Sequence, residues 1–118
     1  PLTVNFSTAS LYGTNPTTAV NSVNALWAGN AKVDDKVVFS GSAEDVSSIV
    51  NGVLNHSGNL FNAKSYSFTE YSVLDVNMDG KVIFSGVKND TDLIKNNVVL
   101  HPANMFNSLS YNIKDTRP

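Results

Sequence analysis

The sequence has no cysteine, few charged side chains and no long apolar run. Without cysteine the chain has no disulfide framework, no thiolate metal site and no cysteine nucleophile. No apolar stretch approaches the roughly 20 residues that a membrane-spanning helix needs. Charged residues make up 15% of the chain and the formal net charge is −2, which gives no electrostatic footprint for nucleic acid or for an anionic membrane.

The length of 118 residues, with a hydrophobic share of 42%, suits a single domain with a modest core. Asn, Ser and Thr supply the solubility that Lys and Glu usually provide. Because the chain begins at Pro1 rather than Met, we expect it to be a piece excised from a longer protein. The lack of a visible signal peptide therefore says little about that parent protein.

An internal repeat organises most of the chain. Sliding the sequence by 45 residues aligns 30–68 (repeat 1) with 75–113 (repeat 2) without a gap, and residues 1–29 form a leader. Within the repeats, Lys36–Gly41 matches Lys81–Gly86 at all but one position. Two such units usually pack face to face, because neither can bury its apolar face alone. We therefore predict one domain, 1–118, built from two tandem repeats.

Each repeat has the same predicted order of a loop, a short strand and a helix. The strands are β-branched and aromatic runs that begin at Val37 and Val82, and we predict that these two residues pair as a miniature antiparallel bridge. Helices are predicted from Asp45 and Asp90, where an N-cap belongs and apolar residues follow at helical spacing. With a further strand expected at Leu2–Ser7, and only turns and polar linkers between it and repeat 1, the predicted fold class is α+β.

The loop that opens repeat 2 carries the clearest chemical pattern. Asp75, Asn77 and Asp79 place oxygen ligands at alternate positions, and Gly80 then allows a sharp turn. The backbone carbonyl of Lys81 is the next expected ligand. Hard oxygen ligands on a flexible loop suit Ca²⁺, whereas zinc would want His or Cys. The sequence therefore predicts a calcium site here.

The closing ligand of this loop departs from the usual pattern. An EF-hand loop ends with a bidentate carboxylate at its twelfth position, and that position here is Gly86. We predict that Asp90 reaches back to the ion instead, since its counterpart Asp45 stands at the same place in repeat 1. The alternative is that Asp90 only caps the helix.

The loop that opens repeat 1 is a degenerate version of the same pattern. Lys32 stands at a ligand position and Asp35 replaces the turning glycine. A second, degenerate calcium site would draw its ligands from Asn30, Asp34, the backbone of Lys36 and Asp45. Alternatively, the Lys32 ammonium pairs with Asp34 or Asp45 and holds the loop without metal. One working site and one degenerate site is the expectation.

Other candidate residues are assigned structural roles. His56 and His101 are expected at equivalent helix ends, where a cation interacts favourably with the helix dipole. Trp27 is expected to close the core beside a loop, and Tyr66 and Tyr111 to fill one packing role twice. The acid pairs, Asp34 with Asp35 and Asp90 with Asp92, mark no cleft for glycosidase chemistry, and no nucleophilic triad or phosphate loop stands out. An enzyme is not expected.

The loop of repeat 2 resembles dockerin and other EF-hand-like calcium repeats of secreted or surface bacterial proteins. The residues that carry the likeness are Asp75–Val82, Leu26–Asn30 and the later Asn89-Asp90, whose place in the dockerin-type unit supports Asp90 as a ligand. The resemblance covers about residues 26–113. It departs in its longer repeats and in Gly86, which replaces the closing Asp.

The resemblance implies a non-catalytic, calcium-stabilised module of an extracellular bacterial protein. Such a module would serve attachment to a cell-surface component or docking to another protein, and no recognition motif for a cohesin is visible. The alternative is a carbohydrate-binding module appended to an exported enzyme, with tyrosines and Trp27 as the sugar platform.

Overall fold

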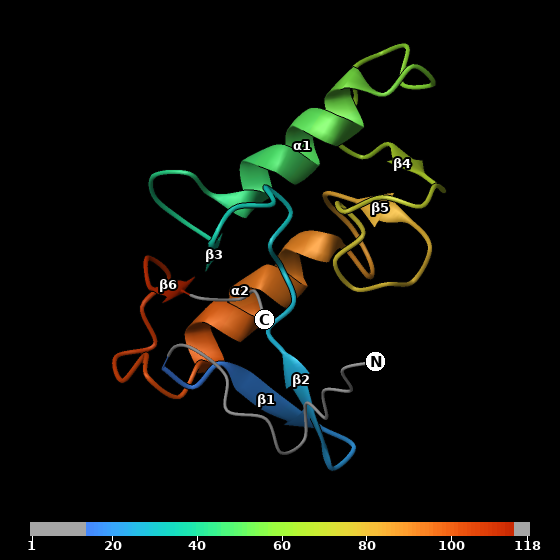
Figure 1. The fold of residues 1–118 in the computed structure, drawn as a ribbon. Helices are drawn as coiled ribbons and strands as arrows, with labels where there is room; N and C mark the ends of the chain where they lie inside the picture. Colours follow the sequence, from blue (N-terminus) through green and yellow to red (C-terminus); the bar gives the residue numbers. More distant parts are fainter. Residues whose placement is uncertain (1–13, 115–118) are drawn as a thin grey trace.

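The computed structural model describes residues 14–114, so the strand predicted at Leu2–Ser7 lies outside the described range. Its elements, in chain order, are β1 (Thr17–Val20), β2 (Val23–Leu26), β3 (Lys36–Val38), α1 (Asp45–Asn55), β4 (Ser67–Phe68), β5 (Val82–Ile83), α2 (Asp90–Leu100) and β6 (Asn112–Lys114). The two helices pack against each other, and pairs of short strands lie around them (Figure 1). The predicted α+β class is confirmed.

Both helices bury one narrow face, on which buried residues recur every four positions. Ile49 and Val53 of α1 are fully buried, as are Ile94 and Val98 of α2. Residues four apart lie on the same side of a helix, and burying an aliphatic side chain of this size contributes about 1.5–3 kcal/mol. The core is completed by loop and strand residues, among them Trp27, Val37, Phe68, Val76, Val82 and Ile113. Neither helix is long and apolar enough to cross a membrane, within residues 14–114.

The helix N-caps are displaced by one residue from the prediction. Glu44 and Asn89 flank the two helices in extended conformations, and the Asn89 side chain accepts the Asp92 N–H at 2.9 Å, as an N-cap does. Asp45 and Asp90 are instead the first residues of the helices. Their assignment as N-caps is therefore wrong, because both carboxylates bond back to the preceding loops.

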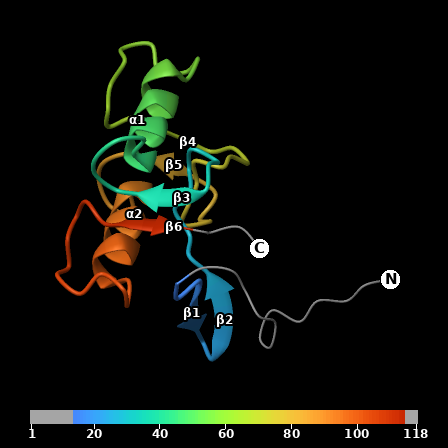
Figure 2. The same cartoon turned by 60° about the vertical axis from the view of Figure 1, so that its left-hand side comes forward.

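The strands exchange partners between the two repeats. β3 pairs antiparallel with β6, which places Val37 opposite Ile113, and β5 pairs antiparallel with β4, which places Val82 opposite Phe68. Figure 2 shows β3 and β6 side by side and running in opposite directions. The predicted Val37–Val82 bridge is wrong: each valine pairs with the tail strand of the other repeat, which brings its own buried side chain. The two pairings share one register after a shift of 45 residues.

A β-hairpin precedes repeat 1, where the sequence predicted only turns and polar linkers. β1 pairs with β2 across Asn21 and Ser22, which have φ angles of 49° and 64°. Positive φ at both central residues matches the right-handed twist of the flanking strands. The hairpin leads into Trp27, which is 8% exposed and donates its indole N–H to the Asn15 carbonyl at 2.8 Å. The predicted core role of Trp27 is confirmed.

Candidate metal centre

Loop 2, residues 75–83, is folded by hydrogen bonds from its own side chains. The two carboxylate oxygens of Asp75 accept the N–H groups of Asp79 at 3.1 Å and Gly80 at 2.8 Å. Asn77 Oδ1 accepts the same Asp79 N–H at 2.9 Å, and Asp79 Oδ1 accepts the Lys81 N–H at 3.0 Å. Because each acceptor bonds a residue a few positions ahead, the three predicted ligand side chains are gathered around one turn.

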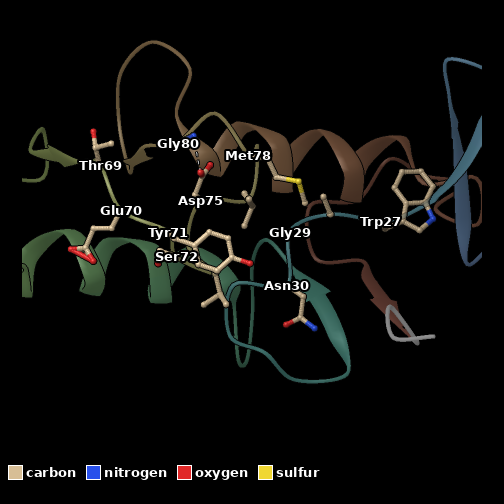
Figure 3. Close-up of a pocket in the computed structure, with 13 residues that line it drawn as sticks. Trp27, Gly29, Asn30, Thr69, Glu70, Tyr71, Ser72, Asp75, Met78 and Gly80 are labelled. Atoms are coloured by element: carbon tan, nitrogen blue, oxygen red, sulfur yellow. Dashed lines mark hydrogen bonds between the residues drawn. The ribbon is translucent and has the colours of Figure 1, made fainter.

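The backbone of this turn needs the left-handed region at two positions. Gly80 has a φ of +87° and Met78 a φ of +59°. A Cβ at Gly80 would meet no heavy atom within 4 Å, so the glycine is required by its backbone conformation rather than by space. Figure 3 shows the Asp75 carboxylate turned toward Gly80. The predicted turning role of Gly80 is confirmed.

Asp90 reaches back to loop 2 from the first turn of α2. Its Oδ1 accepts the N–H groups of Val76 at 3.0 Å and Asn77 at 3.3 Å, and its Oδ2 accepts the Ile83 N–H at 2.8 Å. The side chain is fully buried. Burial raises the pKa of Asp90, the charge of Asp75 raises it further, and the backbone hydrogen bonds oppose both effects. Asp90 thus fastens both ends of loop 2 to α2.

The predicted role of Asp90 as a calcium ligand stays a prediction. A carboxylate offers about four lone-pair positions, and the contacts of Asp90 to backbone N–H groups use three of them. Oδ2 accepts a single N–H, which leaves it acceptor capacity. The carboxylate can therefore hold the loop and still offer one oxygen.

The predicted metal ligands of loop 2 are all hard oxygen groups. They are the carboxylates of Asp75 and Asp79, the amide oxygen of Asn77 and the carbonyl of Lys81. Within residues 14–114, His, Cys, Asp and Glu form no group of three or more that could hold a metal ion. A site in loop 2 would therefore depend on amide and carbonyl oxygens beside its carboxylates, a mixture that Ca²⁺ accepts.

Loop 1, residues 30–38, shares two of the four internal hydrogen bonds described for loop 2. Asn30 Oδ1 accepts the Asp34 N–H at 3.0 Å, and Asp34 Oδ1 accepts the Lys36 N–H at 3.0 Å. Val33 has a φ of +60°, matching Met78 of loop 2. Where Asp75 has a second carboxylate oxygen, Asn30 has an NH₂ group, and this group donates to the Asp34 carbonyl. The structure therefore brings Asn30, Asp34 and Lys36 together in one turn, and this turn has one carboxylate fewer than the turn of loop 2.

Asp45 ties loop 1 to α1 as Asp90 ties loop 2 to α2. Its Oδ1 accepts the Lys32 N–H at 2.9 Å, and its Oδ2 accepts the Val38 N–H at 2.7 Å. The side chain is fully buried, and burial raises the pKa of Asp45, with a smaller contribution from the charge of Asp34. Lys32 thus contacts Asp45 through its backbone N–H, and the residue itself is exposed.

The two histidines end their helices as C-caps but differ in environment. His101 is 2% exposed, its ring centroid lies 4.9 Å from that of Trp27, and burial lowers its pKa. A neutral imidazole follows at pH 7, so the predicted cationic role is wrong for His101. His56 instead lies 2.8 Å from a Glu70 carboxylate oxygen and stacks on Phe68 at 4.3 Å.

A buried asparagine after each helix holds the following turn in place, a structural role that was not predicted from the sequence. Asn59 donates its amide N–H groups to the carbonyls of Val53 at 2.8 Å and Ala63 at 2.9 Å, and accepts the Ala63 N–H at 2.9 Å. Asn104 forms the equivalent three bonds in repeat 2. The turn that Asn59 fixes leaves Phe61 92% exposed. The only signal in the sequence is that both asparagines fall at the same repeat position.

Comparison with known proteins adds no family to this picture. No protein-family model matches the chain, and neither a curated protein nor a solved structure matches it. The likeness of loop 2 to dockerin-type repeats is therefore carried by its own residues and stays a prediction.

Proposed function

We propose that the protein is a non-catalytic, calcium-stabilised module of an extracellular bacterial protein, serving attachment or docking to another protein. The observation that carries the proposal is the arrangement of loop 2. Asp75, Asn77 and Asp79 accept successive backbone N–H groups around one turn, with Gly80 at its sharpest point. That arrangement gathers oxygen donors without any soft ligand, which favours Ca²⁺.

Electrostatics around loop 2 also favour a divalent cation. The charge of Asp75 raises the pKa of the buried Asp90 carboxylate, which is a repulsion between two negative groups. A bound Ca²⁺ would offset that repulsion and favour ionisation of both carboxylates. In loop 1 the charge of Asp34 likewise raises the pKa of the buried Asp45, but Asn30 stands in place of Asp75, so loop 1 offers a cation one carboxylate fewer.

Calcium would act mainly on stability. The ion binds the folded loop and hardly the unfolded chain, so it stabilises the native state by mass action. Loop 2 is joined to α2 through Asp90 and to the core through Val82, which is fully buried. Fixing the loop would therefore also fix the start of α2 and the strand β5.

Carbohydrate binding is the second candidate function, and one observation favours it. Tyr71 is fully exposed, at 108% of its reference area, and lines a groove beside loop 2. Exposed aromatic rings are natural stacking surfaces for apolar ligand faces. Tyr66 and Tyr111 do not serve in this way, because both pack partly buried against the core, as predicted.

Isothermal titration of calcium into chelator-treated protein tests the proposal. We expect one calcium site in the unmutated chain, no measurable binding in Asp75→Ala, and unchanged binding in the matched loop 1 variant Asn30→Ala. Two equal sites, or no binding, would contradict the proposal. Asp90→Asn addresses the closing ligand separately: calcium affinity equal to that of the parent protein would exclude Asp90 from the ligand set.

A further inference from the structure

Neither repeat contains a strand pair of its own within the described residues 14–114. β3 of repeat 1 pairs with β6 of repeat 2, and β4 of repeat 1 pairs with β5 of repeat 2. Figure 1 shows the first of these pairs to the left of the helices and the second to the right. The helices α1 and α2 also contact each other across the repeat boundary. Each repeat is therefore half of a fold, and the part that completes it is another repeat.

The surfaces through which the repeats meet are alike. Three fully buried residues of repeat 1 have identical, fully buried counterparts in repeat 2: Val37 with Val82, Ile49 with Ile94, and Val53 with Val98. The two strand pairs also share one register after a shift of 45 residues. In a two-fold interface, the same patch is used on both sides and is complementary to itself. The surface that repeat 1 offers to repeat 2 of its own chain therefore fits repeat 2 of a second copy equally well.

A short turn joins the two repeats. The Ser72 carbonyl accepts the Asp75 N–H at 3.2 Å, and Ser72 Oγ accepts the Leu74 N–H at 3.2 Å. The residues on either side of Ser72 are exposed, Tyr71 at 108% and Val73 at 60%. Straightening this turn would break two local hydrogen bonds and would remove neither Tyr71 nor Val73 from a buried position. Residues 71–73 are therefore suited to act as a hinge.

The residues that flank this hinge are anchored to the protein. On its N-terminal side, Glu70 lies 2.8 Å from His56 Nε2 of the same repeat. On its C-terminal side, the Leu74 side chain packs partly buried against the core and lies directly against Gly52 of α1. If the hinge opens, Glu70 stays with repeat 1 and Leu74 moves with repeat 2. The Leu74 contact would then form again on α1 of a second copy.

We infer that the protein binds a second copy of itself by exchanging repeats, so that repeat 1 of each chain closes on repeat 2 of the other around the hinge at 71–73. The product, a repeat-exchanged dimer, is a closed two-fold assembly that keeps the contacts of the monomer outside the hinge. A short linker holds the repeats of one chain at an effective concentration of the order of 1 mM, so exchange should compete when folding chains reach about that concentration. Loop 2 and Asp90 belong to the same repeat, so the inference does not depend on the proposed calcium function.

A designed disulfide across β4 and β5 tests the inference, because the chain has no cysteine of its own. Ser67 and Ile83 are Cα partners, and partners in an antiparallel pair lie about 4.5–5.5 Å apart, within the range of a disulfide. The double variant Ser67→Cys, Ile83→Cys is refolded from urea at about 0.01 mM and at about 1 mM, oxidised, and run on a denaturing gel without reductant. We expect a bond within one chain at the low concentration and a covalent dimer at the high one. The single variant Ser67→Cys gives the background of chance cross-linking.

Hinge variants of the cysteine-free chain sharpen the test. Size-exclusion chromatography after refolding should show a dimer-to-monomer ratio that rises about tenfold for each tenfold rise in free monomer. Deleting Tyr71 and Ser72 should raise this ratio, and inserting Gly-Ser-Gly-Ser after Tyr71 should lower it.

Three results would overturn the inference: monomer alone at the high concentration, a dimer whose cysteine pair closes within each chain, or a ratio that neither hinge variant changes. If the deletion variant does not fold, the cysteine pair in the full-length hinge still decides. A covalent dimer that binds no calcium would contradict the proposed function and leave the inference standing, and a monomer that binds one calcium would do the reverse.

Discussion

Loop 1 and loop 2 share a positive φ at Val33 and Met78, but they differ in chemistry and at the next turn position, where Gly80 has a φ of +87° and Asp35 is not among the residues with positive φ. The first side chain of each loop accepts an N–H four residues on, at 3.0 Å from Asn30 and 3.1 Å from Asp75. Each loop is then tied to its helix by a buried aspartate. Amide and carboxylate oxygens both accept such bonds, whereas only a carboxylate brings the charge that attracts a cation. The comparison separates what shapes the loop from what would bind the ion.

The largest expected effect is shared by both loops. Asp45→Ala and Asp90→Ala each leave buried backbone N–H groups without an acceptor, at about 1–3 kcal/mol for each group. We expect each variant to lose about 3 kcal/mol or more of unfolding free energy, measured by urea denaturation in chelator. Asp35→Ala, at an exposed position in loop 1, is the control and should change stability by about 0.5 kcal/mol at most. If Asp45→Ala behaves like this control, the buried aspartates do not hold the loops.

The second effect should belong to loop 2 alone. At a calcium concentration about 100-fold above Kd, binding adds about 2.7 kcal/mol of stability, which raises Tm. Thermal unfolding followed by circular dichroism, with calcium and with chelator, measures the shift. Asp75→Ala should remove the shift and Asn30→Ala should keep it. If the Tm of the unmutated chain is the same with calcium and with chelator, that result would count heavily against the proposed function.

Converting loop 1 into loop 2 is a sharper test with a smaller effect. The triple variant Asn30→Asp, Lys32→Asn and Asp35→Gly restores the residues that loop 2 has at the same positions. We expect a second calcium site, weaker than the first, with Kd in the roughly 10⁻⁴–10⁻³ M range of extracellular modules. Calorimetric stoichiometry rising from one to two measures the gain. Stoichiometry that stays at one would show that these three side chains are not what disables loop 1.

The smallest expected effect compares the two histidines. Burial lowers the pKa of His101 below 6.5, so below that pH the unfolded chain takes up a proton that the folded protein does not. Stability from the buried neutral ring is therefore present above pH 6.5 and lost as pH falls. Urea denaturation at pH 7.5 and pH 5.5 should show a weaker pH dependence in His101→Gln than in the parent protein. His56→Gln is the matched variant at the other helix end, and equal slopes in both variants would contradict the assignment.

The sequence predicted the elements of each repeat better than their connections. The repeat spacing located both helices and both loops, because apolar periodicity and alternating oxygen side chains are local signals. It could not tell which strand Val37 would pair with, because Val82 and Ile113 are equally good buried partners on apolarity alone. The β1–β2 hairpin was missed because its turn, Asn21-Ser22, lacks the glycine that usually marks such turns.

For the candidate site, the sequence located the loop, and it did not predict which groups Asp90 contacts there. Asp75, Asn77, Asp79 and Gly80 lie in loop 2 as their spacing predicted. Asp90 was singled out correctly as reaching back to the loop, but its contacts there are to backbone N–H groups. A side chain's ability to accept backbone donors from a distant loop depends on tertiary geometry, which spacing along the chain does not encode.

The exchange of strands between repeats has a consequence for the order in which the protein can form during synthesis. β3 is synthesised before repeat 2 begins, yet its partner β6, Asn112–Lys114, lies at the C-terminal end of repeat 2. Repeat 1 therefore cannot finish folding on its own while the ribosome is still adding repeat 2. A premature stop just before residue 112 would leave every residue of repeat 1 in place and still deprive β3 of its only strand neighbour within the described chain. Repeat 1 therefore depends for its last strand pairing on the tail strand of repeat 2.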